Sequence, residues 1–127
     1  LDTVMPGSVL ADFGDAIRFG ASSAAEDEKD LSKVFVRLEM FEGFTKGFIQ
    51  GLESSLTKEE VLALPMGAYI LTLEQSMRFL GDYLNGDTYF RIHYPEHNLD
   101  RARNQMKLVQ DMEEKMNQMN AIVEKYL

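Results

Sequence analysis

Three carboxylates lie close together near the beginning of the chain. Asp2 precedes the turn signal Pro6-Gly7, and Asp12 and Asp15 follow in a segment that predicts a helix capped by Ser8. Hard cations such as Mg²⁺ prefer oxygen ligands, so carboxylates around a turn could form the edge of a metal site. Carboxylates are also common on loops and helix surfaces. From the residues alone, a Mg²⁺ site and ordinary surface acids both stay open.

A second set of charged residues shares one face of a long predicted helix. Glu74, Arg78 and Asp82 follow one another at intervals of four residues, which places their side chains next to each other. By themselves they favour a surface ladder of ion pairs. The turn signal Asn85-Gly86-Asp87 comes next and predicts a chain reversal that carries Tyr89 back toward Arg78.

Five motifs occur in order along the chain with consistent spacing. They read LDTVMPGSVLADFGDAIRFG (1–20), FEGFTKGF (41–48), TLEQSMRFL (72–80), DYLNGDTYF (82–90) and NLDRAR (98–103). Together they cover nearly the whole sequence. In this order they resemble the aminoglycoside phosphotransferase superfamily of protein-kinase-like enzymes, and most closely its N-acetylhexosamine 1-kinase branch.

The resemblance implies a fold and a place within a larger enzyme. We expect a mainly α-helical C-terminal subdomain of a protein-kinase-like phosphotransferase, with about five helices in one domain over residues 1–127. In that family the metal-binding aspartate would stand immediately before Leu1, and the catalytic-base aspartate and the nucleotide-binding lobe would precede it. The chain is therefore expected to be an excised C-terminal piece that is inactive by itself.

The resemblance also implies roles for particular residues. Phe19, Arg78 and Tyr89 would hold the sugar acceptor, through an aromatic face, directed donors and a hydroxyl group on a rigid ring. Asp2 would stand at the edge of the metal site, and Asp12 would be a buried anchor for the catalytic loop. The complete enzyme would use ATP and Mg²⁺ to phosphorylate the anomeric hydroxyl of an N-acetylhexosamine. The fragment itself is expected to bind no cofactor.

Other functions remain open at this stage. A kinase of the same superfamily could act on an aminoglycoside, choline or another small alcohol. The chain could instead be a helical interaction module without enzymatic activity. Self-association is a further alternative, because part of the apolar stripe on the last predicted helix could be left uncovered.

Composition excludes several classes of protein. The chain has 127 residues, a formal net charge of −8 and no cysteine. Its acidity argues against nonspecific binding to nucleic acids or anionic membranes, which require a basic face. No apolar run is long enough to span a membrane. The absence of cysteine rules out disulfides and thiolate metal sites, and it fits a cytoplasmic protein.

Hydrophobic periodicity and capping signals predict the helices after the first one. The expected helices span 38–52, a short segment after the Thr57–Glu60 capping box, 65–85, and 98–126 with Asn98 as its N-cap. In the third of these, alternating intervals of four and three residues predict an apolar stripe that is buried in the centre of the fold. The stripe comprises Met66, Ile70, Leu73, Met77, Leu80 and Leu84.

Four further expectations concern packing and loops. Gly43, Gly47 and Gly51 share one helix face, which predicts close packing of another helix against it. Residues 21–33, with the acidic run 26–30, are expected to form a solvated and mobile loop. Residues 33–38, with Val34, Val36 and Leu38 at alternate positions, predict a short extended segment. His93 and His97 are expected to be loop residues, because Pro95 between them prevents a helical pair of metal ligands.

Overall fold

The chain folds mainly into helices. The computed structural model describes residues 6–52 and 55–127, in which six α-helices and one short 3₁₀ helix are found. The expectation of a mainly α fold with about five helices is therefore confirmed. The α-helices are α1 (Pro6–Gly20), α2 (Leu38–Gly51), α3 (Lys58–Leu62), α4 (Leu64–Leu84), α5 (His97–Glu114) and α6 (Met116–Glu124), and the 3₁₀ helix is η2 (Leu31–Lys33). None of the described helices is both long and apolar enough to cross a membrane.

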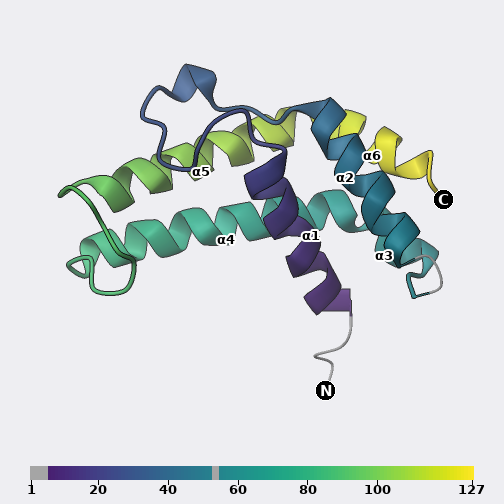
Figure 1. Ribbon diagram of the computed structural model, residues 1–127, viewed down its shortest axis with the longest axis horizontal. Coiled ribbons are helices and arrows are strands. Elements are labelled where there is room, and N and C mark those ends of the chain that lie inside the picture. Colours follow the sequence, from purple (N-terminus) through teal and green to yellow (C-terminus); the bar gives the residue numbers. More distant parts are fainter. Residues whose placement is uncertain (1–5, 53–54) are drawn as a thin grey trace.

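Helices α4 and α5 run antiparallel along each other and form the largest helix contact, while α1 crosses α4 (Figure 1). The core lies where these three helices meet α2 and α6. Phe13 of α1 is fully buried there and packs edge-on against Phe41, with a distance of 5.9 Å between the ring centroids. The other large buried side chains are Ile17, Leu64, Leu108, Met112 and Met119.

The capping box at α3 is confirmed. The hydroxyl of Thr57 accepts a hydrogen bond from the Glu60 N–H at 3.1 Å, and the Glu60 carboxylate accepts one from the Thr57 N–H at 2.6 Å. Both interactions satisfy N–H groups that the start of a helix leaves without partners. Local sequence chemistry alone fixes this helix start.

Other helix limits differ from the prediction. Helix α1 already begins at Pro6, so Ser8 lies inside it. Helix α5 begins at His97 instead of following an Asn98 cap, and the buried Asn98 side chain bonds to α4 and the preceding turn. His97 is therefore a buried helix residue and not a loop residue. The long last helix is divided at Lys115 into α5 and α6.

The acidic loop is held in place, contrary to the expectation that it is solvated and mobile. Glu26 pairs with Arg18 at 2.6 Å, and Asp27 contacts His97 at 2.8 Å. The Asn104 side chain also donates to the carbonyl of Ala25 at 2.8 Å. Helices α1 and α5 therefore anchor this loop through side chains that are distant in sequence.

The predicted segment is extended up to Arg37, and its backbone bonds to Ala21 and Ser23, whereas Leu38 already begins α2. The segment makes one isolated bridge, between Ser22 and Val36. The Val36 N–H donates to Asp111 at 2.6 Å, and Lys115 donates to the Val36 carbonyl at 2.8 Å. Two charged side chains, one on α5 and one at its C-cap, therefore provide hydrogen-bond partners for both backbone groups of Val36.

The regular apolar stripe of α4 faces outward, so the prediction that it is buried is wrong. Five of its six members are exposed, with fractions from 41% for Leu80 to 74% for Leu84. The side of α4 that packs against the fold instead carries Leu64 and Phe79 together with small and polar residues. Thr72 and Ser76 are buried there, and each donates to a backbone carbonyl at 2.8 Å. The stripe is a continuous apolar surface along one helix.

The glycine face of α2 is also open. A Cβ atom at Gly43, Gly47 or Gly51 would meet no atom within 4 Å, so the predicted close packing of another helix is wrong for the described residues. Close packing by glycine occurs elsewhere. A Cβ at Gly14 of α1 would come within 2.8 Å of Leu71 Cδ2 on α4.

These two environments predict opposite effects of the same substitution. Gly47→Ala should raise the free energy of unfolding by up to about 1 kcal/mol, because alanine favours the helix and meets no neighbour. Gly14→Ala should lower it by about 1–3 kcal/mol through overpacking against α4. Urea denaturation of the two variants measures both changes. A loss of stability in Gly47→Ala would show that another surface covers the α2 glycines.

Candidate functional site

Arg78 and Tyr89 line the same surface hollow. The hollow has a volume of about 400 Å³ and lies between the last turns of α4 and the turn that follows. Gly86 and Asp87 adopt positive φ angles of 92° and 59°, which reverse the chain there. The turn predicted from the sequence thus brings Tyr89 next to Arg78. The remaining lining residues are Gly81, Asp82, Asn85, Thr88 and Phe90.

Asp82 holds the segment that carries Tyr89. Its carboxylate accepts hydrogen bonds from the N–H groups of Tyr89 at 2.9 Å and Phe90 at 3.0 Å. The amide of Asn98 on α5 donates to the same carboxylate at 2.9 Å. Burial opposes ionisation of Asp82, but these donors outweigh it and hold the pKa of Asp82 below its ordinary value of 3.8.

The ladder of ion pairs expected on this helix face is not formed. Asp82 is only 7% exposed and uses its carboxylate as an acceptor for backbone and amide donors. No ion pair within residues 6–52 and 55–127 involves Arg78 or Glu74. The guanidinium of Arg78 is exposed, so its donors can face a ligand in the hollow.

Phe19 lies on a neighbouring hollow of about 340 Å³. Phe90 lines both hollows, and its ring lies 4.7 Å from that of Phe79 on α4. The Phe19 ring is 61% exposed, and the guanidinium of Arg18 lies over it at 4.1 Å. The three predicted sugar-contacting residues therefore border two hollows that meet at Phe90.

The predicted carboxylate site is only partly described. Asp2 lies outside the described residues. Asp12 is exposed on α1, so the buried position expected for it is not found in this chain, and its anchoring role stays a prediction about a larger enzyme. Asp15 contacts Arg18 at 3.5 Å. No group of three or more potential ligands for a metal ion occurs in the part of the chain that the structure describes.

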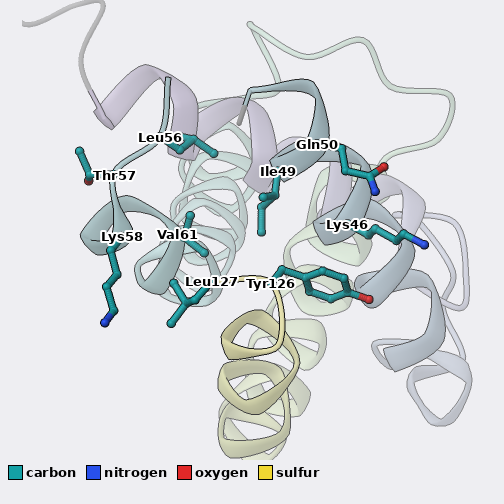
Figure 2. A pocket seen from close by; sticks show the side chains of 9 residues that line it. All are labelled: Lys46, Ile49, Gln50, Leu56, Thr57, Lys58, Val61, Tyr126 and Leu127. Carbon is teal, nitrogen blue, oxygen red and sulfur yellow. The ribbon is translucent and has the colours of Figure 1, made fainter. Parts of the chain in front are cut away.

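A larger hollow of about 650 Å³ lies between α2, α3 and the last residues of the chain (Figure 2). Its apolar lining includes Ile49, Val61 and Leu127, while Lys46 and Lys58 lie on opposite sides of it. The sequence reasoning missed this hollow, because its walls come from three distant segments without a shared motif. None of the predicted sugar-contacting residues lines it.

The comparison with known protein families gives no assignment. No family model matches the sequence.

The Asp82 geometry predicts how the hollow responds to pH. Because the pKa of Asp82 is lower in the folded chain, its carboxylate stabilises the fold at pH values above the ordinary 3.8. This contribution is lost as the pH falls through the folded pKa. We expect the backbone amide NMR signals of Tyr89 and Phe90 to titrate in acid. Asp82→Asn should show the shifted signals at neutral pH and abolish the titration.

Glu74→Gln is the matched control, because Glu74 is an exposed acid two turns earlier on the same helix. It should leave both amide signals and their titration unchanged. An equal effect of the two substitutions would mean that the overall charge of α4, and not the Asp82 hydrogen bonds, determines the signals.

Proposed function

We propose that the chain is the substrate-binding helical part of an ATP-dependent small-molecule kinase. The acceptor in this proposal is an N-acetylhexosamine, either N-acetylglucosamine or N-acetylgalactosamine, which is phosphorylated at the anomeric hydroxyl. The observation that carries the proposal is the position of Arg78 and Tyr89 on one hollow, with Phe19 on the hollow beside it. These are the three residues that the family resemblance assigns to the sugar.

The chemistry of these side chains suits a neutral sugar with an acetamido group. The exposed guanidinium of Arg78 offers directed donors to hydroxyl or carbonyl oxygens. Tyr89 is 82% exposed, so its hydroxyl is free to bond to a ligand. The Phe19 ring offers an aromatic face for the apolar C–H surface of a sugar ring. Asp82 positions the Tyr89 backbone and does not take part in the chemistry.

In this proposal the reacting groups belong to a part of a cytoplasmic kinase that this chain does not contain. An aspartate base and a metal-binding aspartate would precede Leu1, and Mg²⁺ would neutralise the charge of the ATP phosphates. Asp2 would stand at the edge of that metal site. The chain would contribute the position of the acceptor, on which the rate of phosphoryl transfer strongly depends. By itself it would be inactive.

The exposed stripe of α4 agrees with a subdomain that packs against another part of a protein. Five exposed apolar residues in one row along a helix form the kind of surface that partners usually cover. The same observation favours the second candidate function, a helical interaction module without enzymatic activity. A kinase of the same superfamily with a different acceptor is the third reading. Activity measurements with sugars and other acceptors distinguish these three candidate functions.

The test measures ATP consumption by the full-length protein that contains this chain. The acceptor panel is N-acetylglucosamine, N-acetylgalactosamine, glucose, kanamycin and choline, and turnover should be confined to the two acetylated sugars. Arg78→Ala and Tyr89→Phe should each raise the KM for the sugar about fivefold, because each removes a hydrogen bond worth about 1 kcal/mol.

Arg103→Ala and Tyr83→Phe are matched controls, because neither residue lines the two hollows. Both should leave the KM unchanged. Turnover of kanamycin or choline would show that the protein is a kinase with a different class of acceptor. A lack of turnover with every acceptor would favour the interaction module.

A further inference from the structure

The hollow beside Phe19 gathers positive charge in an acidic chain. Arg18, Arg91 and Arg101 all line it, although the formal net charge of the sequence is −8. They come from α1, from the segment after α4, and from α5. Glu26 is the single carboxylate that lines the hollow. Three guanidinium groups therefore face one carboxylate.

Arg18 is fixed before any ligand arrives. It is only 7% exposed, and its Nη1 donates to Glu26 at 2.6 Å and to Gln105 at 3.3 Å. Its Nε is buried and has no hydrogen-bond partner in the described structure. Arg18 thus engages the lining carboxylate, and one of its buried donors is left unsatisfied, which is a costly arrangement.

Arg101 and Arg91 keep their charges without a carboxylate partner in the described residues. The Nη1 of Arg101 donates to two neutral acceptors, the Arg91 carbonyl at 3.0 Å and the Asn98 side chain at 2.8 Å. The Nε of Arg101 is buried without a partner. The Arg91 side chain is exposed and makes no ion pair in the described part of the chain. Asp27, whose pKa is lowered mainly by its bond to His97, is already engaged at 2.8 Å.

The walls of this hollow are aromatic. Phe19, Phe79 and Phe90 line it, and the guanidinium of Arg101 lies over the Phe79 ring at 5.5 Å. Arginine side chains bind phosphate oxygens with two parallel hydrogen bonds, and aromatic faces cover the rings of ligands. A ligand that joins a phosphate group to a ring would match both features of the hollow.

We propose that this hollow binds an organic phosphate, with Arg91 and Arg101 on the phosphate group and the phenylalanine rings around its ring system. The phosphate-binding arginines are separate from the neutral-sugar hollow at Arg78 and Tyr89, although Phe90 borders both hollows and Phe19, which the proposed function assigns to the sugar, lines this one. The proposal does not depend on the kinase function. It concerns an anion that the acidic chain as a whole would repel.

The test titrates the 127-residue chain with three probes and follows backbone and arginine side-chain NMR signals. The probes are N-acetylglucosamine 1-phosphate, inorganic phosphate and N-acetylglucosamine. We expect the sugar phosphate to bind more tightly than inorganic phosphate, and to shift the Nε signals of Arg91 and Arg101. Arg91→Ala should weaken its binding about tenfold or more, because it removes charged hydrogen bonds to the phosphate. Arg91→Lys should recover part of the affinity.

Arg91 is the preferred position, because its exposed side chain supports no other described residue. Arg103→Ala is the control for general charge, since Arg103 is exposed on α5 outside the hollow. Equal losses in Arg91→Ala and Arg103→Ala, or no saturable binding of either phosphate probe, would overturn the proposal. Equal affinity for inorganic phosphate and the sugar phosphate would overturn the role of the aromatic walls.

The same titrations keep this proposal apart from the kinase function. Arg78→Ala should weaken binding of neutral N-acetylglucosamine and leave binding of inorganic phosphate unchanged. If the unsubstituted chain binds inorganic phosphate but not N-acetylglucosamine, only the proposed acceptor is contradicted. The reverse result would contradict only the phosphate site.

Discussion

Two glycines determine how closely α1 lies against α4. A Cβ at Gly14 would come within 2.8 Å of Leu71, and one at Gly67 would come within 3.1 Å of Leu10. Residues without a Cβ permit this crossing without a shift of Leu71 or Leu10. It directs Phe13 and Ile17 into the core and places the end of α1 beside the hollow. Burial of the core and the position of the candidate site therefore depend on the same contact.

A second constraint on the structure is found at the C-terminal end of α4, where the buried side chains are polar. Asp82 and Asn98 are buried together, and the Asn98 amide also donates to Asp87 at 3.0 Å. Asp82 accepts from two N–H groups of the irregular segment and Asn98 donates to Asp87 within it, so a loop acquires a defined shape from helix side chains. The hydrogen bonds explain how Tyr89 can be highly exposed while its backbone is fixed.

Structures that depend on adjacent residues could be predicted from the sequence. Contacts between residues that are distant in sequence could not. The Thr57 capping box and the turn at 85–87 depend on adjacent residues, and both are found. The α4 stripe has an unmistakable period, but a period identifies an apolar face without saying what covers it. Asn98 has the residue type of a helix cap, yet a buried carboxylate on another helix takes its amide. Arg78 and Tyr89 could be paired in advance through the turn, whereas the cluster of Arg18, Arg91 and Arg101 unites three distant segments.

Because the apolar stripe of α4 faces outward, the packing of the core does not depend on which residues form the stripe. Met77 and Leu84 lie outside the buried core, so polar replacements there would leave no cavity behind. The interior packing and the outer row can therefore change independently in sequence. Related chains could keep one interior while adapting this row to different partners, and an engineer could make the isolated chain more hydrophilic without redesigning its core.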